Sequence, residues 1–427
     1  MPLKEVKGVR GHYAIEGPLK LRVLRGCVEL TGKELGGGDE AVVPAAKATL
    51  LEAVDEAEVE LLGGGSIIEL EASTIPREWV EFVESVSGHC TISTIGPMDS
   101  GKTFFVTYAA NKLIAKGSSV AVVDCDVGQS NIGPPTSIGL GFLDGQVVFL
   151  DEVQPSEAYF VGSTSPAGHL LPMVVGTLKL VSSAKARCGV LLVDTPGMIY
   201  GGPARAYQLH VAEAVNPDVV VALQREGEGA HLARHLKSLG YEVVELPASP
   251  WVRRRSQDER RRLRERAFHN YFTKKGVAQH AVDLRGVAIL GSFMGSGCPL
   301  QGDAVKLLES MAGCGILYGE LSADSLILVL DGRPKDRDFY AKLRGLFPDR
   351  AVKVLLKGFE RGLVVGLIGS GGRLLDIGIM IGLDFKEHRA TVATPLKGVD
   401  EVKAVKLGCV RLDEEYGEVE RLEPGYA

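Results

Sequence analysis

The sequence lacks the features that mark membrane proteins and secreted proteins. No run of about 18 apolar residues occurs, so no segment is long enough to span a bilayer as a helix. The first residues, MPLKEVKGVRGHY, have no apolar signal-peptide core. The 7 cysteines include no C-x-x-C pair, which is typical of a reducing compartment and argues against a zinc site or a disulfide framework. We therefore expect a cytoplasmic protein that contacts no membrane.

The chain also lacks an excess of positive charge. Its 48 Lys and Arg residues against 54 Asp and Glu residues give a formal net charge of −6. This balance excludes the basic coat of a histone-like protein, so any contact with nucleic acid must be made by a local patch or groove. An apolar fraction of 45% in 427 residues is typical of a soluble globular protein with two or three domains.

Three regions differ in their pattern of apolar residues. Residues 1–75 alternate short apolar runs with glycine clusters, which predicts a small antiparallel β domain. Residues 76–284 alternate β-branched runs such as SVAVVDCD with longer helical stretches, which predicts a mostly parallel sheet covered by helices. From 285 to 427 the glycine-rich β pattern returns. The predicted fold class is α/β, with N-terminal and C-terminal β-rich domains flanking the central domain.

The segment GPMDSGKT matches the phosphate-binding loop (P-loop) pattern G-x-x-x-x-G-K-[ST]. A β-branched run precedes it and a helical pattern follows it, as the motif requires, so the central domain is predicted to be a P-loop NTPase core. In such a loop backbone N–H groups surround the phosphates, Lys102 reaches the β- and γ-phosphates, and the Thr103 hydroxyl ligates Mg²⁺. No N-K-x-D element that reads guanine is present, which favours ATP and leaves another NTP open. The predicted nucleotide-binding residues are Gly96, Pro97, Met98, Asp99, Ser100, Gly101, Lys102 and Thr103.

Two predicted strands of the central domain end in aspartates. Asp124 and Asp126 close one strand, and Asp194 closes another. Parallel strands bring their carboxyl ends to one edge of the sheet, where the phosphate loop also lies. Phosphoryl transfer uses Mg²⁺ and a carboxylate that orients or deprotonates the nucleophile, so these aspartates are candidates for both tasks. The alternative for any single one of them is a capping or turn-forming role.

The motifs together resemble one family. GPMDSGKT followed by DCDVGQSNIGPP is similar to the polynucleotide 5′-hydroxyl kinases, which include the RNA kinase subunit of the pre-mRNA 3′-end cleavage machinery, ribosomal-RNA-processing kinases and archaeal relatives. FVGSTSPAGH and DTPGMIYGGPARAYQ resemble further family segments, so the resemblance covers about residues 90–275. It implies transfer of the γ-phosphoryl group of ATP to the 5′-hydroxyl end of RNA, with DNA as an alternative acceptor. It also implies Mg²⁺ as cofactor and RNA-processing proteins as candidate partners.

The resemblance assigns roles to the acidic residues. Asp126, which precedes V-G-Q, takes the position of the family's catalytic aspartate, the general base for the 5′-hydroxyl. Asp194 stands where relatives have asparagine, so it is interpreted either as a neighbour of Mg²⁺ or as a partner in the base role. The candidate metal residues are Thr103, Asp126 and Asp194.

The resemblance also indicates where the nucleic-acid end binds. Met198 replaces a family tryptophan that stacks on the terminal base, and such stacking contributes about 1–3 kcal/mol. Tyr200 and Tyr207 are the two candidates to replace that tryptophan. The predicted nucleic-acid-binding residues are Gln129, Thr164, Tyr200 and Gln208.

Eight arginines lie in WVRRRSQDERRRLRERAFHNYF, residues 251–272. SQDE fits a capping box with Ser256 as N-cap and Glu259 at N3, which predicts a helix that begins after Ser256. Arg255 and Arg260 then occupy the N′ and N4 positions, where a hydrophobic pair ordinarily meets. Two guanidinium groups that face one spot are unfavourable unless an anion lies between them, and a triphosphate is such an anion.

The same run resembles the family's lid pattern R-S-x-D-x-R, whose two arginines close over the transferring phosphoryl group. The predicted catalytic residues are Lys102, Asp126, Arg255 and Arg260.

The remainder of the lid helix is expected to dock through an apolar stripe. Leu263, Ala267 and Tyr271 recur every four residues and predict that stripe. The other arginines are expected to be solvated or to touch the nucleic-acid backbone. They are Arg253, Arg254, Arg261, Arg262, Arg264 and Arg266.

Two other functions compete with the kinase. An ATP-binding assembly factor of an RNA-processing complex would keep the fold and lose turnover, but the presence of all four predicted catalytic residues favours the enzyme. A GTPase-like switch built around DTPG is disfavoured by the missing guanine-reading element and by the arginine lid.

Overall fold

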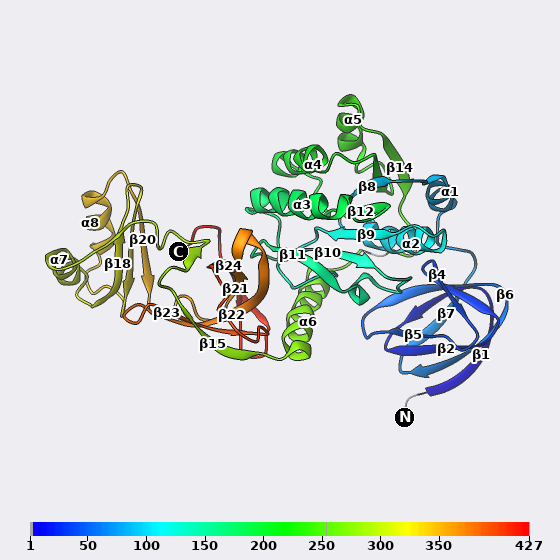
Figure 1. Ribbon diagram of the computed structural model, residues 1–427, viewed down its shortest axis with the longest axis horizontal. Helices are drawn as coiled ribbons and strands as arrows, with labels where there is room; N and C mark the ends of the chain where they lie inside the picture. The colour runs from blue at the N-terminus through cyan, green and yellow to red at the C-terminus, as the bar shows by residue number, and fades with distance from the viewer. Residues whose placement is uncertain (1–2, 253, 427) are drawn as a thin grey trace.

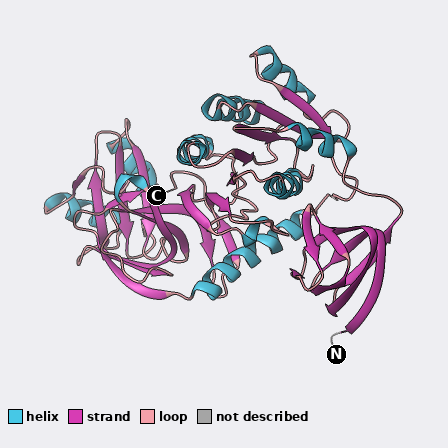
Figure 2. Cartoon of the chain, turned by 45° about the vertical axis from the view of Figure 1, so that its right-hand side comes forward, coloured by secondary structure: helices cyan, strands magenta, loops and turns pink. Residues whose placement is uncertain are grey.

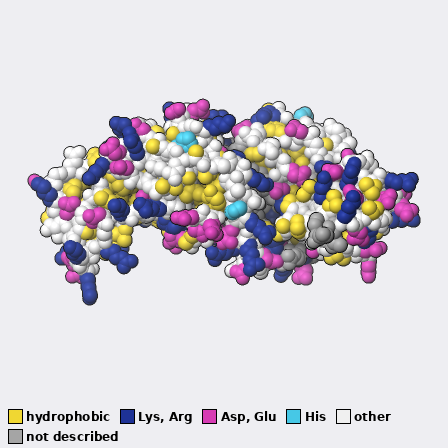
Figure 3. Space-filling model, turned by 90° about the horizontal axis from the view of Figure 1, so that it is seen from below, with side chains coloured by type: hydrophobic (Ala, Val, Ile, Leu, Met, Phe, Trp, Pro, Cys, Tyr) yellow, Lys and Arg dark blue, Asp and Glu magenta, His cyan; other side chains and the backbone are white. Residues whose placement is uncertain are grey.

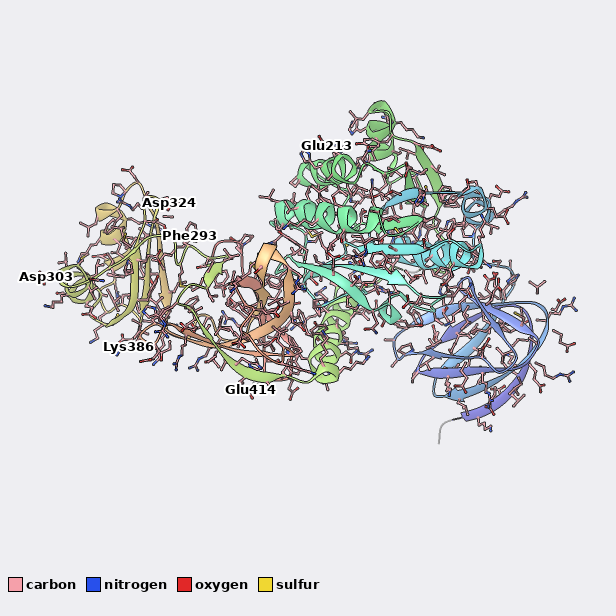
Figure 4. All side chains as sticks on the ribbon, viewed as in Figure 1. Glu213, Phe293, Asp303, Asp324, Lys386 and Glu414 are labelled. Atoms are coloured by element: carbon pink, nitrogen blue, oxygen red, sulfur yellow. The ribbon has the colours of Figure 1, made fainter. Side chains whose placement is uncertain are left out.

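The computed structural model describes residues 3–252 and 254–426. Figure 1 shows an elongated molecule with a β unit at the N-terminal end, an α/β unit in the middle and a C-terminal unit at the other end. In Figure 4, Glu213 marks the α/β unit, and Asp303 and Asp324 mark the outer end of the C-terminal unit. Arg253 of the arginine run lies outside the described residues. In the described part of the chain, no helix is both long and apolar enough to cross a membrane.

The first sheet is antiparallel, as the N-terminal pattern predicts. Its strands run in the order β4-β3-β6-β1-β7, and β2 pairs with β5 and β6. Asn111 of helix α2 (Lys102–Ala115) ties this sheet to the central unit, because its amide donates to the carbonyl oxygens of Thr31 at 2.9 Å and Val147 at 2.7 Å. The strands are β1 (Leu3–Glu16), β2 (Leu19–Arg25), β3 (Cys27–Leu30), β4 (Lys33–Gly36), β5 (Glu40–Val43), β6 (Ala48–Gly63) and β7 (Ser66–Leu70).

The second sheet forms the central unit and is mostly parallel, as predicted. Its order is β11-β10-β9-β12-β8-β13-β14; the pairs β9–β10 and β10–β11 are antiparallel, and the other four pairs are parallel. Every residue of β9 and β12 is buried, which explains their continuous apolar runs. The strands are β8 (Cys90–Ile95), β9 (Val120–Asp124), β10 (Ser137–Leu143), β11 (Pro155–Phe160), β12 (Val190–Asp194), β13 (Val219–Gln224) and β14 (Val243–Pro247).

Helices cover both faces of this sheet. Alternate residues of β9 and β12 enter two different cores, because successive side chains of a strand point to opposite faces. One core contains α1 and α2, and the other contains α3 and α4 (Figure 1). The remaining helices of the central unit are α1 (Arg77–Ser85), α3 (Leu170–Lys185), α4 (Gly202–Val215), α5 (Ala230–Ser238) and the short 3-10 helix η1 (Leu150–Glu152).

The C-terminal unit contains two sheets. The third sheet has the order β15-β23-β22-β21-β24-β16, with β25 paired to β24, and the fourth has the order β17-β18-β19-β20. Helices α7 and α8 pack on the fourth sheet, so this part is less purely β than its sequence pattern suggests. The elements are β15 (Ala278–Asp283), β16 (Ala288–Leu290), β17 (Cys298–Pro299), α7 (Asp303–Ala312), β18 (Ile316–Leu321), β19 (Ser325–Leu330), α8 (Phe339–Leu346), β20 (Ala351–Leu356), β21 (Leu363–Ile368), the 3-10 turn η2 (Ser370–Gly372), β22 (Leu374–Asp384), β23 (Arg389–Thr394), β24 (Ala404–Leu412) and β25 (Glu418–Arg421).

Helix α6 (Gln257–Lys275) connects the central unit to the third sheet, and Figure 2 shows it running beside the strands of that sheet. Its buried residues are Phe268 and Phe272, whereas Leu263 and Ala267 of the predicted stripe are only partly buried. The predicted stripe is therefore displaced by one residue. The next strand, β15, pairs with β23, so the third sheet takes its first strand from within residues 76–284. The domain limits at 75 and 284 stay predictions.

Candidate active site

The phosphate loop joins β8 to α2, which is the predicted strand–loop–helix context. Gly96 has a φ of 157°, and a Cβ on it would lie 2.3 Å from the carbonyl oxygen of Leu223, so no larger residue fits. Lys102 is 7% exposed, and its Nζ donates to the carbonyl oxygens of Gly96 at 3.0 Å and Pro97 at 2.9 Å. Burial lowers the pKa of Lys102, and nearby carboxylates oppose that shift.

The strand register brings the aspartates to the loop. Asp194 lies opposite Asp124 in the parallel pair β12–β9. Its Oδ2 accepts a hydrogen bond from Thr103 Oγ1 at 2.6 Å, which joins the end of β12 to the first turn of α2. Burial raises the pKa of Asp194 to about 6, and the Lys102 charge opposes this rise. A cation placed here would favour the ionised carboxylate.

Asp124 and Asp126 differ in their surroundings although they are two residues apart. Asp124 is fully buried and accepts the backbone N–H groups of Asp126 at 3.0 Å and Asn131 at 2.6 Å, so it shapes the loop after β9. Burial, followed by the nearby Asp194, raises the pKa of Asp124 to about 8. Asp126 is partly buried, and its Oδ1 accepts the N–H of Gly128 at 2.9 Å. Within the described residues no hydrogen bond reaches its Oδ2, so this oxygen is available to a substrate.

The start of α6 lies on the phosphate loop. The predicted capping box is confirmed, with Ser256 Oγ accepting the N–H of Glu259 at 3.1 Å. Asp99 Oδ2 accepts the backbone N–H of Arg255 at 3.0 Å and the Nη2–H of Arg260 at 2.5 Å. Arg255 Nη1 also donates to Gln129 Oε1 at 2.5 Å, which links the lid to the loop after β9. The structure therefore brings the two lid arginines to the loops that hold Lys102 and Asp126.

A pocket of about 300 Å³ opens beside the loop and the lid. Its basic lining residues are Arg225, Arg254, Arg255 and Arg260, and its aromatic one is Tyr200. On the face shown in Figure 3, Lys and Arg side chains lie among Asp and Glu side chains. Asp99 and Glu228 also line the pocket, but its four arginines outnumber these two carboxylates, so its charge suits an anionic ligand.

The predicted nucleic-acid contacts have different surroundings. Tyr200 is 63% exposed, and its ring stacks near His231 with centroids 6.2 Å apart. Thr164 is 5% exposed, and its buried Oγ1 has no partner among the described residues. Gln208 is 1% exposed and donates to the carbonyl oxygens of Pro196 and Met198, so it shapes that loop from inside.

Burial differs between the two tyrosines considered for base stacking. Tyr207 is 1% exposed and packs in the core of the central unit, so it presents no free ring face. Met198 is partly buried against that core. Of these three side chains, Tyr200 is the exposed one.

Comparisons with known proteins show the family of this chain. Residues 96–274 match the model for the mRNA cleavage and polyadenylation factor CLP1 P-loop. The polyribonucleotide 5′-hydroxyl-kinase of Pyrococcus furiosus is 32% identical over 76% of this chain and 88% of its own length. That of Thermococcus kodakarensis is 31% identical over 80% of this chain and 94% of its own length. The chain belongs to the CLP1 family.

The fold of this CLP1-family protein has a solved counterpart. The structure of the wild-type Clp1p–Pcf11p complex aligns over 96% of this chain and 98% of that chain, with a TM-score of 0.65 and 15% identity. At that identity the likeness establishes the fold. The predicted polynucleotide kinase resemblance and fold class are therefore confirmed, and the phosphate loop is the nucleotide-binding loop of the family.

The donors at the loop fit a divalent cation held partly by phosphate. In the described part of the chain, no group of three or more His, Cys, Asp or Glu residues is arranged to hold a metal ion by itself. Thr103 Oγ1 and Asp194 Oδ2 are 2.6 Å apart, however, and Mg²⁺ is commonly held by one or two protein oxygens together with phosphates and waters. The pair therefore matches the donor set expected for Mg²⁺ with a bound nucleotide.

Sequence reasoning missed the role of Asp99 in the lid contact. A carboxylate inside a phosphate-binding loop would repel the ligand, so its presence is itself a signal for a cationic partner. Asp99 also has a positive φ of 55°, and its carbonyl oxygen accepts from Arg225 Nη2 at 3.3 Å. Arg225 was missed because nothing in its sequence neighbourhood links it to the loop.

Replacing Lys102 with alanine is expected to weaken ATP binding by about 10- to 100-fold, because a charge-assisted hydrogen bond is worth roughly 1.5–3 kcal/mol. Titration calorimetry with ATP and Mg²⁺ measures this change. Lys112→Ala is the matched control, since Lys112 lies on the same helix and pairs with Glu29 instead. Wild-type affinity in the Lys102 variant would remove this lysine from the nucleotide site.

Proposed function

We propose that this protein is a polynucleotide 5′-hydroxyl kinase that transfers the γ-phosphoryl group of ATP, or another NTP, to the 5′-hydroxyl end of RNA, with DNA as an alternative acceptor. The observation that carries the proposal is the meeting of the lid with the two catalytic loops. Asp99 holds Arg260 at the phosphate loop, and Gln129 holds Arg255 beside Asp126. The relatives from Pyrococcus furiosus and Thermococcus kodakarensis are named polyribonucleotide 5′-hydroxyl-kinases, which supports the same reaction here.

Each residue has one task in the transfer. The 5′-hydroxyl oxygen forms a bond to the γ-phosphorus as the bond to the β–γ bridging oxygen breaks, and ADP leaves. Asp126 accepts the hydroxyl proton on its Oδ2. Lys102, Arg255 and Arg260 stabilise the charge on the phosphoryl oxygens, which is where this kind of transition state needs help.

Mg²⁺ would be held by Thr103 and Asp194, and when bound it would neutralise charge between the β- and γ-phosphates. Asp126 is the third candidate ligand of Mg²⁺. Its negative charge also favours the protonated form of the nearby Lys102 ammonium group. Thr103 and Asp194 already point their oxygens at each other across the end of the sheet. This arrangement supports Asp194 as the cation's neighbour and Asp126 as the base.

We place the end of the polynucleotide between the loop after β9 and the basic pocket. Gln129 and Thr164 lie on the Asp126 side, where a Cβ on Gly128 would stand 3.1 Å from the Thr164 carbonyl oxygen. Tyr200 and the arginines of the pocket line the phosphate loop, and Arg255 reaches from there to Gln129. Aromatic rings beside positive charge are the usual means of holding a single strand without reading its sequence.

Tyr200→Ala is expected to raise KM for a 5′-hydroxyl oligonucleotide by about 5- to 100-fold, because stacking on one base is worth roughly 1–3 kcal/mol. The value of kcat at saturating oligonucleotide should change much less. Tyr340→Ala serves as control, since Tyr340 is 48% exposed on the remote helix α8. Steady-state end-labelling with varied oligonucleotide concentration distinguishes the two parameters. An unchanged KM would remove Tyr200 from the acceptor site.

Incubation with γ-labelled ATP and matched 5′-hydroxyl RNA and DNA oligonucleotides tests the function itself. Label at the 5′ end of RNA is the expected result, and the DNA arm decides whether the second acceptor is used. Label on neither oligonucleotide, by a protein that binds ATP, would contradict the kinase and favour an ATP-binding assembly factor.

A further inference from the structure

One side of helix α6 makes contacts at both of its ends. Arg260, Arg264, Phe268 and Phe272 recur every four residues and so lie along one side of the helix. Arg260 meets Asp99 of the phosphate loop. Phe268 and Phe272 are fully buried in a core shared with β21, β22 and β24 of the third sheet. The rotation of α6 about its own axis that buries these rings therefore also sets the direction in which the Arg260 side chain points.

Arg264 lies between the two contacts and ends on a buried carboxylate. Its Nε donates to Glu418 Oε2 at 3.2 Å, and Arg421 Nε donates to Glu418 Oε1 at 2.5 Å. Arg261 Nη2 donates to the Glu418 carbonyl oxygen at 3.0 Å. The side chains of Arg264 and Glu418 are only 15% and 8% exposed. A paired and buried carboxylate of this kind is costly to separate from its partners, so its geometry is fixed.

The far end of α6 has a second anchor. Tyr271 Oη donates to Asp376 Oδ1 at 2.5 Å, and Lys275 Nζ donates to Asp376 Oδ2 at 3.2 Å. Asp376 is 9% exposed and belongs to β22. The third sheet thus holds the helix at two carboxylates, and Glu418 is the one nearer the site.

We propose that Glu418, acting through Arg264, is a positioning residue for phosphoryl transfer. In this proposal the third sheet holds the start of α6, and with it the lid arginines, in position. The proposal rests on the kinase function proposed above. Side-chain tips lie about 6 Å from a helix axis, so a rotation of about 20° would move the Arg260 guanidinium by about 2 Å. A misplacement of about 1 Å can cost roughly 100-fold in rate. Glu418 itself touches no part of the phosphate loop in the described structure.

The test uses the full chain in the end-labelling assay. Glu418→Gln keeps the size of the side chain and removes its charge, and we expect kcat to fall at least about tenfold while KM for ATP stays within about twofold. Arg264→Met, which keeps an unbranched apolar stem, should give the same pattern. Glu320→Gln is the matched control, because Glu320 is 2% exposed on the fourth sheet and accepts the N–H of Gly295 at 2.7 Å, remote from α6. Thermal unfolding of each variant reports any general loss of stability.

A double-mutant cycle separates positioning from simple destabilisation. If Glu418 acts through the lid, Glu418→Gln should lower kcat by less than about twofold in an Arg260→Lys background. The proposal would be overturned if the fold decreases in kcat of the two single variants simply multiplied in the double variant. It would also be overturned by a wild-type kcat in Glu418→Gln.

Limited trypsin digestion gives a readout that does not need turnover. ATP and Mg²⁺ should protect the lid arginines of the wild type from cleavage and fail to protect those of Glu418→Gln. Equal protection in both proteins would overturn the proposal that the third sheet holds the lid in position. A wild type that transfers no phosphate would contradict the kinase function alone, so the two failures are distinguishable.

Discussion

Replacing Arg260 with alanine is expected to lower kcat by about 10³-fold or more, because an arginine that stabilises a transferring phosphoryl group is worth roughly 10³–10⁵ in rate. The affinity for ATP should fall far less, since Lys102 and the loop backbone still hold the phosphates. Arg260 suits this task because its Nη2 is held by Asp99, while its buried Nε has no partner among the described residues. One donor positions the group, and another remains for a phosphoryl oxygen.

Single-turnover end-labelling and ATP titration, performed on the same variants, separate the two effects. Arg255→Ala should show the same split, because Arg255 Nη1 lies on Gln129 Oε1 in the loop beside Asp126. Arg262→Ala is the matched control, since Arg262 is an exposed arginine of the same helix. Equal losses in kcat and in ATP affinity for the Arg260 variant would indicate a residue that binds nucleotide and does not act on the transition state.

Replacing Asp126 with asparagine is expected to lower kcat by about 10²- to 10⁴-fold, the usual worth of a general base. Asparagine keeps the oxygen that accepts the Gly128 N–H, so the loop after β9 should retain its shape. The ability to take a proton is lost together with the negative charge, whereas the shape of the side chain is kept. Binding of ATP and of the oligonucleotide should therefore stay close to wild type.

Comparison with Asp194→Asn tests whether Asp126 or Asp194 is the general base. Asparagine can still accept from Thr103 Oγ1, and we expect a smaller loss of kcat together with a higher Mg²⁺ requirement. Both variants should be measured across a range of Mg²⁺ concentrations. Near-normal turnover in Asp126→Asn, combined with a large loss in Asp194→Asn, would exchange the two roles.

Several parts of the site could be predicted from local sequence because local chemistry fixes them. The phosphate loop follows from glycine positions that tolerate no side chain, as at Gly96. The start of α6 follows from a capping box whose two hydrogen bonds involve residues three apart. The aspartates at strand ends follow from parallel pairing, which sets Asp194 opposite Asp124.

The docking side of α6 could not be predicted in the same way. Leu263, Ala267 and Tyr271 form an apolar stripe at the correct spacing, but the helix buries Phe268 and Phe272 one position further along. The third sheet decides this, because its core accepts two phenylalanine rings and its strands offer the carboxylates of Glu418 and Asp376 to Arg264 and Tyr271. Arg264 is accordingly paired with protein, although its place in a basic run suggested solvent or nucleic acid.

The sequence by itself determined the phosphate loop, the acidic strand ends and the positions of Arg255 and Arg260 at the start of α6, since each depends on residues within a few positions of one another. The tertiary structure decided which of these groups meet. Asp99 reaches Arg260 across 161 positions, and Glu418 reaches Arg264 across 154. Contacts between residues so far apart depend on how whole sheets and helices pack, and no spacing in the chain encodes that packing locally.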